Sequence, residues 1–226
     1  MKPPMKVVAF IPIKMNNERL PGKNVKEFDD GRPLCDLVFD TVKKVKNLDE
    51  CYCYCSSEEI VKYLPDKVKY LKRDKKLDSS TTSINEIISS FIETVDSDYY
   101  VLLHVTAPFI KQDTIEKCIS AATSGDFDSA LSVNQLRDFL WNETGPVNFD
   151  PSNIKRTQDL ETLYRETSGV YVFSKELFKK HSRRVGFKPY FHDIGSVESV
   201  DIDYPEDFEV ANAIYMRKKT NSKNNV

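Results

Sequence analysis

The chain has 226 residues and a nearly balanced charge, with 33 Lys and Arg against 35 Asp and Glu. This length allows one large domain or two small ones with a full hydrophobic core. No basic tail or basic helix stands out, which argues against nucleic acid as the main partner. The apolar run near the N-terminus is too short for a signal peptide or a membrane span, so we expect a cytoplasmic protein that crosses no membrane.

The first strand is predicted at residues 7–13, where the run VVAFIPI breaks abruptly into a polar segment. That segment carries Lys14, Arg19 and Lys23. In open α/β sheets, ligands bind outside the carboxyl ends of the parallel strands. Cations together with unpaired backbone N–H groups on one loop suit a polyphosphate. An ordinary solvated loop between a strand and a helix would carry the same charges, so charge alone leaves both interpretations open.

Alternating strand and helix patterns fill the chain up to residue 134. Apolar side chains at helical spacing mark the helices, and short apolar runs followed by turn residues mark the strands. Strands are predicted at residues 51–57, 68–73, 98–109 and 127–134, and helices at 31–47, 57–64, 78–95 and 114–123. This alternation implies an α/β fold with a mostly parallel, doubly wound sheet. No internal repeat or low-complexity linker divides it, so we expect a single domain at residues 1–219.

Five cysteines are present, and three of them form the motif CYCYC at residues 51–55. A metal cluster is one interpretation, but zinc sites usually combine two C-x₂₋₄-C pairs, and this chain has no second pair. Strand alternation puts the three cysteines on one face and the two tyrosines on the other. We therefore favour a buried strand with small apolar thiols. The odd cysteine count without a disulfide framework indicates a reducing cytoplasm.

The alternation fails at residues 135–165. Turn signals at 143–146 and 150–151, with aromatic residues on both sides, predict a hairpin that leaves the sheet as a lid or a dimer arm. We expect Phe139, Trp141 and Phe149 to lie in a dimer contact. After the hairpin the pattern predicts, in order, a strand and helix at 167–180, a strand and helix at 199–219, and a disordered tail at 220–226.

Asp201 and Asp203 lie two residues apart on the last predicted strand, so their carboxylates project from the same face. Like charges at this spacing favour a cation between them, and Mg²⁺ is commonly held by one or two carboxylates plus substrate phosphates. A solvent-facing edge strand with two acidic residues is the alternative. The cationic loop at the end of another strand favours a joint nucleotide–metal site. The chain has neither G-x-x-x-x-G-K-[ST] nor G-x-G-x-x-G, so a P-loop and a Rossmann dinucleotide site are not supported.

The segment IPIKMNNERLPGKN at residues 11–24 resembles the nucleotide-binding signature of the sugar-acid cytidylyltransferases, the CMP-sialate and CMP-3-deoxy-manno-octulosonate synthetases. The resemblance continues, in the family's order, through LKRDKKLD, LLHVTAPF, RTQDL, SGVYVF and VDIDYPEDFEVA. It implies a three-layer α/β/α nucleotidyltransferase fold of the glycosyltransferase-A type. It also implies a reaction in which CTP binds with Mg²⁺, an acceptor oxygen attacks the α-phosphorus, and pyrophosphate leaves.

The resemblance implies roles for individual residues. Lys14 and Lys23 would contact the CTP phosphates with Arg19 close by, and Asp201 and Asp203 would hold Mg²⁺. Other matching positions would bind the nucleotide or the acceptor: Asn24, Arg73, His104, Thr106, Ala107, Pro108, Gln158 and Ser168. The excursion at 135–165 would match the arm by which these enzymes form homodimers.

Departures from the family pattern fall mainly at acceptor positions. Lys14 stands where Arg is usual, which keeps the charge but loses the guanidinium fork, and Asn17 stands where Ser is common. His104 replaces a Gln that contacts sugar in sialate enzymes, and Ser168 replaces an Asn before the glycine. We therefore expect a divergent member with an acidic acceptor other than N-acetylneuraminate, namely another nonulosonate, another sugar acid or a small phosphonate.

Two questions stay open at this point. His104 would either carry charge near an anionic acceptor or serve as a neutral hydrogen-bond donor. The second hypothesis for the whole chain is a nucleotide-binding homologue with little or no catalytic activity, motivated by Lys14 and the absence of the loop glycines typical of sialate enzymes. An RNA-binding α/β protein is a third hypothesis, which the balanced charge disfavours.

Overall fold

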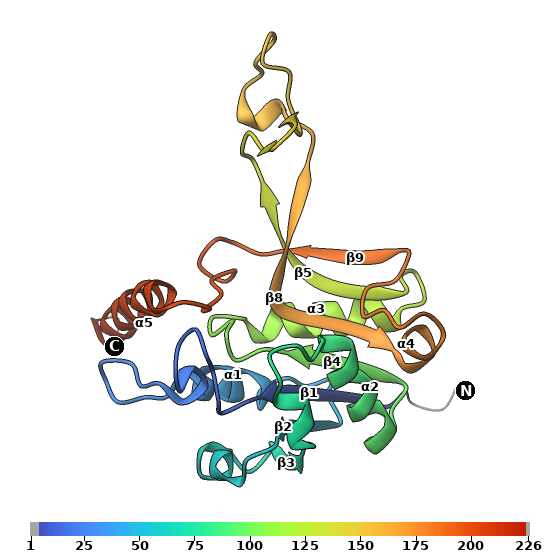
Figure 1. Ribbon diagram of the computed structural model, residues 1–226, viewed down its shortest axis with the longest axis vertical. Coiled ribbons are helices and arrows are strands. Elements are labelled where there is room, and N and C mark those ends of the chain that lie inside the picture. Colours follow the sequence, from blue (N-terminus) through green and yellow to red (C-terminus); the bar gives the residue numbers. More distant parts are fainter. Residues whose placement is uncertain (1–4, 225–226) are drawn as a thin grey trace.

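The structure, a computed structural model that describes residues 5–224, is built around a seven-stranded sheet in the order β3-β2-β1-β4-β8-β5-β9 (Figure 1). All of these strands run in one direction except β8, which is antiparallel to β4 and β5. The strands are β1 (Val7–Ile13), β2 (Glu50–Cys55), β3 (Lys69–Lys72), β4 (Tyr99–Leu103), β5 (Ser129–Leu136), β8 (Leu163–Ser174) and β9 (Pro189–Asp193). The predicted mostly parallel α/β sheet is confirmed.

Helices cover both faces of the sheet. Side chains of strand β1 alternate between the two faces, and both faces are buried. Ala9 and Ile11 pack into one buried cluster, and Val8 and Phe10 pack into another. The first cluster includes side chains of α1 (Leu34–Val42) and α3 (Gln112–Thr123), and the second includes side chains of α2 (Ile84–Thr94) and α4 (Lys175–His181). The result is the predicted three-layer α/β/α arrangement.

The CYCYC motif forms the buried strand that the sequence predicted. Cys51, Cys53 and Cys55 lie in the cluster with α1 and α3. Tyr52 and Tyr54 point to the other face, where their rings lie 5.9 and 5.3 Å from the ring of Phe91. All five cysteines are free and buried. Among residues 5–224, no group of three or more His, Cys, Asp or Glu side chains could hold a metal ion.

A bulge in β8 shapes the edge of the sheet next to the arm. Leu131 of β5 pairs with Tyr171, whereas Val133 pairs with Glu166, so residues 167–170 interrupt the β5–β8 ladder, although Val170 still pairs with Leu103 of β4. The Ser132 hydroxyl accepts a hydrogen bond from the Val170 N–H at 3.1 Å inside this bulge. A Cβ at Gly169 would lie 2.7 Å from the Ser132 oxygen and 2.8 Å from a carbon of Ile110. A side chain at position 169 would displace Ser132 or Ile110, so the bulge favours glycine there.

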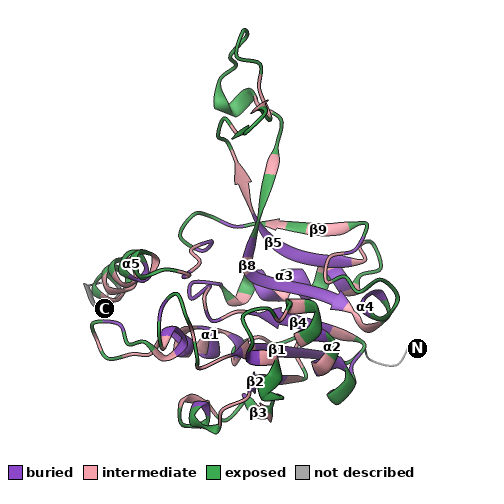
Figure 2. Cartoon of the chain, in the orientation of Figure 1, coloured by how far each residue is buried: buried purple, intermediate pink, exposed green. Residues whose placement is uncertain are grey.

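The arm, residues 135–165, extends away from the body of the molecule in Figure 1. It contains β6 (Trp141–Asn142), β7 (Gly145–Pro146) and the short helix η4 (Thr157–Asp159). Its surface is largely exposed in Figure 2. The ring of Phe149 lies 4.7 Å from Phe139 and 5.3 Å from Trp141, yet Trp141 itself is 63% exposed. The arm thus presents an aromatic cluster to the outside of this chain.

The C-terminal part departs from the sequence predictions in three ways. The strand predicted at 199–203 is wrong, because the N–H of Ile202 bonds to the Thr106 carbonyl instead of joining a ladder. Strand β9 was not predicted, since its sequence PYFHD offers only a short, partly polar pattern. Helix α5 (Pro205–Asn224) continues through residues 220–224, where a disordered tail was predicted, because no helix-breaking residue stops it; residues 225 and 226 lie outside the described range.

No helix within residues 5–224 combines the length and the apolar character needed to cross a bilayer.

Candidate active site

A small apolar cluster brings the cationic loop and the two aspartates together at the carboxyl edge of the sheet. Its members come from the loop after β1, the start of α1, the loop after β4, the segment that precedes α5 and the first turns of α5: Leu20, Phe28, Leu34, Phe109, Ile202, Phe208 and Ala211. Leu20 lies between Arg19 and Lys23, and Ile202 lies between the aspartates. Burial of these side chains therefore fixes the distance between the two halves of the predicted site.

Lys23 is the central contact between the two halves. Gly22, at φ +67°, begins the short helix η1 (Lys23–Val25) in a conformation that favours glycine. This turn directs Lys23 inward, where it is 7% exposed. Its ammonium donates to the Ile202 carbonyl at 2.7 Å and to the Asp203 carboxylate at 3.0 Å. A buried ammonium with an acidic partner is thus placed at the edge of the site.

Arg19 forms the second cationic contact of Asp203, with 3.1 Å between the guanidinium and the carboxylate. It also lies over the ring of Tyr204, at 5.1 Å from the centroid. The contact with Tyr204 and the charge of Asp203 raise the pKa of Arg19. The backbone N–H groups of Asp203 and Tyr204 both donate to Asp207 of α5, which holds this segment in place.

Lys14, Arg19 and Lys23 line one cavity of about 210 Å³. The Asn24 amide donates to the Lys14 carbonyl at 2.7 Å, so Asn24 shapes the loop around this cavity. Asn17 also lines it, and its side-chain oxygen is buried with no hydrogen-bond partner in the described part of the chain. Three cations around one small polar cavity form a site suited to phosphate groups.

Asp201 lies next to the extruded residues of the β8 bulge. One of its carboxylate oxygens accepts from the Ser168 hydroxyl at 2.7 Å. The other oxygen is buried and has no partner among the described residues. Buried carboxylate oxygens are normally paired, and a hard cation such as Mg²⁺ prefers oxygen ligands of this kind. The unpaired oxygen of Asp201 therefore fits the predicted Mg²⁺, whereas the Asp203 carboxylate is paired with Lys23 and Arg19.

His104, just after β4, contacts the same bulge. Its Nδ1 lies 2.9 Å from the Ser168 carbonyl oxygen. A carbonyl can only accept, so we assign the proton to Nδ1, which leaves Nε2 as an acceptor. Burial lowers the pKa of His104, so the ring is neutral at pH 7. This favours the neutral ring of the two hypotheses, but its N–H is donated to the Ser168 carbonyl, so the expected contact with the acceptor stays a prediction.

A second cavity, of about 470 Å³, lies beside Asp201 and Ser168. Asn134 and Arg165 also line it, at the point where β5 and β8 leave the core to form the arm. These two residues are cross-strand partners, whereas the sequence predicted Asn134 as the end of a strand and Arg165 as the end of the excursion, without a role in binding. The sequence signal that could have identified them as binding residues is their polar character near the ends of two strands. An arginine in a polar cavity next to Asp201 can bind a carboxylate.

Some predicted binding residues lie away from these cavities. Arg73 is 3% exposed and forms an ion pair with Asp78 through one terminal nitrogen, whereas its Nε is buried with no hydrogen-bond partner among the described residues. Gln158 is exposed on η4 of the arm. The Thr106 carbonyl accepts from the Ile202 N–H and so supports the aspartate segment, whereas the Ala107 N–H donates to the His104 carbonyl in a local turn. Pro108 lines a different cavity.

Glu198 is a residue that the sequence analysis missed. It is 4% exposed, and its carboxylate accepts from the Lys111 N–H at 3.0 Å and from the Thr114 hydroxyl at 2.5 Å. It therefore supplies the N-terminal cap that α3 lacks in its own sequence. This connection anchors the turn that precedes Asp201 to the body of the fold.

Comparison with known proteins identifies the family. A family model described as "Cytidylyltransferase" matches residues 8–223. The chain belongs to this cytidylyltransferase family. It is accordingly a nucleotidyltransferase that depends on CTP, and the resemblance found in the sequence is confirmed.

Named relatives are distant in sequence. The pseudaminic acid cytidylyltransferase of Campylobacter jejuni is 25% identical over 230 residues, which cover 93% of this chain and 97% of that protein. An N-acylneuraminate cytidylyltransferase of Streptococcus agalactiae is 22% identical over 215 residues, with 90% of this chain and 52% of that protein covered. The chain thus spans nearly all of the first relative and about half of the second.

Solved structures confirm the fold. A CMP:2-keto-3-deoxy-manno-octonic acid synthetase complexed with CTP superposes with a TM-score of 0.70 at 14% identity, covering 94% of this chain and 99% of that one. A 4-diphosphocytidyl-2C-methyl-D-erythritol synthase from Anaerococcus prevotii gives a TM-score of 0.66 at 16% identity, covering 94% and 96%. Both have the nucleotidyltransferase architecture predicted here.

Proposed function

We propose that this cytidylyltransferase transfers CMP from CTP to a nonulosonate or a related sugar acid, with Mg²⁺ as cofactor and release of pyrophosphate. The observation that carries the proposal is the contact of Lys23 with both Ile202 and Asp203, which closes the cationic loop onto the aspartate segment. Phosphate binding in the cavity lined by Lys14, Arg19 and Lys23 is part of the proposal, and the contact of Lys23 with Asp203 supports it. Because the chain belongs to the cytidylyltransferase family, the nucleotide is CTP.

In the proposed reaction, an acceptor oxygen forms a bond to the α-phosphorus while the bond from that phosphorus to the β-phosphate oxygen breaks. Lys14, Arg19 and Lys23 would orient the triphosphate and neutralise the charge that develops on the leaving pyrophosphate. Asp201 and Asp203 would hold Mg²⁺, which when bound supplies charge neutralisation at the phosphates. Ser168 and His104 would fix the orientation of Asp201 and of the bulge around it.

The acceptor would occupy the cavity lined by Asn134, Arg165 and Ser168. Arg165 would pair with the acceptor carboxylate, since a guanidinium binds carboxylates through two parallel hydrogen bonds. The names of the relatives, pseudaminic acid and N-acylneuraminate cytidylyltransferases, support a nonulosonate acceptor. The neutral Nε2 of His104 would favour an acceptor that offers a hydroxyl or amide donor over one that offers an additional anion.

We further propose that the arm forms a homodimer. Large apolar side chains on it are exposed in this chain, including Trp141 at 63%, Val147 at 52% and Ile154 at 65%. Exposed apolar patches of this kind mark interaction surfaces. In such a dimer Gln158 would reach the neighbouring subunit's site. The five buried, reduced thiols support a cytoplasmic location.

Pyrophosphate release with CTP, Mg²⁺ and a panel of acids tests the proposal. The panel contains pseudaminate, N-acetylneuraminate, 3-deoxy-manno-octulosonate and a small phosphonate. We expect the highest kcat/KM with a nonulosonate other than N-acetylneuraminate. Pyrophosphate release with the phosphonate alone would show that the acceptor is a phosphonate and not a sugar acid. Tight CTP binding without any pyrophosphate release would instead support an inactive homologue.

A further inference from the structure

One acidic side chain in the proposed acceptor cavity has no role in the reaction described so far. Three carboxylates line this cavity, those of Glu166, Asp201 and Asp207. Asp201 is the proposed Mg²⁺ ligand, and Asp207 accepts from two backbone N–H groups of the aspartate segment. Glu166 has neither function, although it stands next to Arg165, the proposed partner of the acceptor carboxylate. Its place in the cavity calls for an explanation of its own.

A hydrogen bond across the β8 bulge fixes the Glu166 carboxylate. Glu166 pairs with Val133 on one side of the interrupted ladder, and Tyr171 pairs with Leu131 on the other. The Tyr171 hydroxyl donates to Oε1 of Glu166 at 2.6 Å, so this bond joins the two ladder residues that flank the bulge. Burial raises the pKa of Tyr171, so the phenol keeps its proton and acts as the donor.

Arg184, in the segment that follows α4, holds the same carboxylate. Its guanidinium lies 2.6 Å from Oε1 of Glu166 and 3.9 Å from the ring centroid of Tyr171. A guanidinium stacked on an aromatic face has a defined orientation. Both bonds go to Oε1, and no donor to Oε2 is found in the described part of the chain. The Glu166 side chain is 48% exposed, so Oε2 is available to accept from a ligand.

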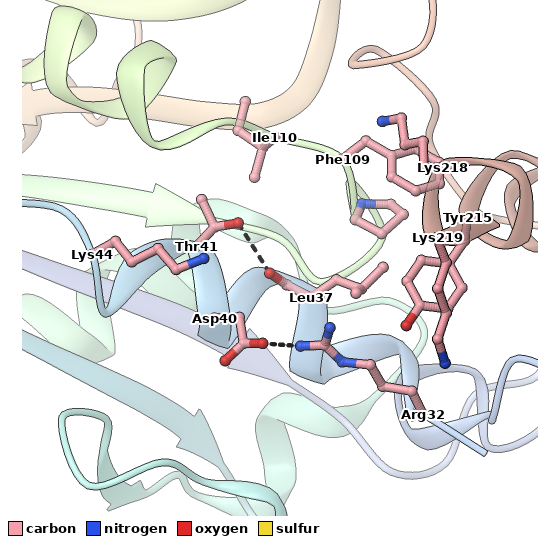
Figure 3. A pocket seen from close by; sticks show the side chains of 11 residues that line it. Arg32, Leu37, Asp40, Thr41, Lys44, Phe109, Ile110, Tyr215, Lys218 and Lys219 are labelled. Atoms are coloured by element: carbon pink, nitrogen blue, oxygen red, sulfur yellow. Dashed lines mark hydrogen bonds and ion pairs between the residues drawn. The ribbon is translucent and has the colours of Figure 1, made fainter. Parts of the chain in front are cut away.

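The pairing of Glu166 with Arg184 also leaves Arg165 available. In the cavity shown in Figure 3, by contrast, Arg32 pairs with Asp40, so the arginine and the carboxylate that line that cavity neutralise each other. Within residues 5–224, Arg165 forms no ion pair, although Glu166 is its neighbour in the sequence. The acceptor cavity therefore offers a cation and, one residue along β8, a carboxylate oxygen that can accept hydrogen bonds.

We propose that Glu166 determines the specificity of the acceptor site, with Oε2 accepting a hydrogen bond from a hydroxyl or amide N–H group of the acceptor. Arg184 and Tyr171 act through Glu166 and are positioning residues. A hydrogen bond to a charged acceptor is stronger than one between neutral groups, and a second anion on the ligand would be repelled. The site thus selects sugar acids that carry hydroxyl or acylamino groups and a single negative charge, an inference that rests on the proposed function.

Calorimetry on the full chain tests this inference, with CTP present and Mg²⁺ removed by a chelator so that binding is measured without turnover. The ligands are pseudaminate, N-acetylneuraminate and 3-deoxy-manno-octulosonate. Succinate is added as an acid with a second anionic group and no hydroxyl or amide donor. We expect the parent chain to bind at least one of the sugar acids.

Glu166→Gln should change the affinities for the two kinds of acid in opposite directions. Its amide oxygen can keep the bonds from Tyr171 and Arg184, so the NH₂ group takes the place of Oε2. The sugar acids should then bind about tenfold more weakly, because a donor faces their donors. Succinate should bind at least threefold more tightly, because the repulsion is lost. A merely structural role of Glu166 would weaken both, and this outcome, or an unchanged affinity for the sugar acids, overturns the inference.

Controls restrict the effect to the acceptor cavity. Glu176→Gln removes a carboxylate at an exposed position of α4 outside this cavity and should change each constant less than twofold. The affinity of Glu166→Gln for CTP should also stay within twofold, because Glu166 does not line the cationic cavity. Equal effects of Glu166→Gln and Glu176→Gln would overturn the inference. Circular dichroism confirms that each variant is folded.

A double-mutant cycle tests the positioning role of Arg184. Arg184→Met should weaken sugar-acid binding at least threefold in the parent and less than twofold in Glu166→Gln, since it acts through that carboxylate. Equal effects in both backgrounds would overturn this role. The expected binding pattern supports the inference whether or not pyrophosphate is released once Mg²⁺ is restored, and absent release contradicts the proposed function alone. A parent chain that binds none of the sugar acids overturns both.

Discussion

The candidate active site and the arm are held together in opposite ways. At the active site, hydrogen bonds join distant parts of the chain, as in the contact of Lys23 with Ile202, 179 residues apart. Within residues 138–159 of the arm, the side-chain hydrogen bonds found span ten residues or fewer, as in the bonds of Asn148 to Leu140 and Asp138. A cluster of buried apolar side chains supports the candidate active site, whereas the aromatic cluster of the arm faces outward.

This difference separates the candidate site, whose contacts lie within one chain, from the arm, for which we propose a partner subunit. The cationic cavity and both aspartates lie within a single chain, so substitutions there should change catalysis and leave association alone. The arm has local turns but little apolar cover, so substitutions there should change association first. The following predictions test that separation, beginning with the largest effect.

Asp203→Asn should lower kcat by about 10²–10³-fold, the range found when one group that stabilises transition-state charge is removed. The amide keeps the shape of the side chain but loses the negative charge that Arg19, Lys23 and the proposed Mg²⁺ require. Pyrophosphate release measures the loss, and size-exclusion chromatography should show an unchanged oligomer. Glu206→Gln, at the exposed start of α5, serves as the control. Near-normal turnover of Asp203→Asn would remove the metal assignment.

Lys14→Ala should lower kcat by about 10²-fold, because it removes a cation from the phosphate cavity. Lys14→Arg, which restores the residue usual in the family, should keep activity within a few-fold of the parent. The comparison of both variants separates charge from side-chain geometry. If Lys14→Ala turns over like the parent, its role at the phosphates is wrong.

Trp141→Glu should weaken the proposed dimer by roughly 30-fold or more, since truncating a central aromatic anchor costs about 2 kcal/mol. Sedimentation at several protein concentrations measures the dissociation constant. Asn153→Glu adds the same charge at another exposed position of the arm and should have little effect. A monomeric parent chain, or equal effects of both variants, would contradict the proposed dimer arm.

The sequence predicted those parts of the fold that depend on local patterns. The alternation in β1 and β2 follows directly from which side chains are apolar, and both strands are confirmed. The pair Asp201 and Asp203 was found by an argument from a strand that does not exist, because the Ile202 N–H bonds to Thr106 across the chain. The β8 bulge at Gly169 likewise arises from contacts with residues distant in sequence, and no pattern of period two or 3.6 reports them.

At the candidate site, too, the sequence predicted what lies close together in the chain and missed contacts between distant residues. Lys14, Arg19 and Lys23 share one loop, so their convergence could be predicted. Arg73 matched the motif LKRDKKLD, yet the fold pairs its guanidinium with Asp78 of the same motif, an ion pair that the motif alone does not predict. Glu198 carries no motif, and its importance comes from capping a helix that begins more than eighty residues earlier. The functional roles themselves remain predictions that the experiments above address.

The smallest effect concerns the pH dependence of stability, and it arises at His104. Burial lowers the pKa of the native imidazole, whereas the unfolded chain has the ordinary value of about 6.5. Below that value the unfolded state binds a proton that the native state does not, so the free energy of unfolding falls as the pH drops.

His104→Gln can donate to the Ser168 carbonyl through its amide and cannot titrate. Urea unfolding at pH 8 should therefore change little, while the loss of stability between pH 7 and pH 5.5 should become smaller in this variant. Some loss should persist, because burial also lowers the pKa of His192. The exposed His181→Gln should keep the full loss of the parent, and an equal loss in both variants would show that His104 is not the buried neutral group described here.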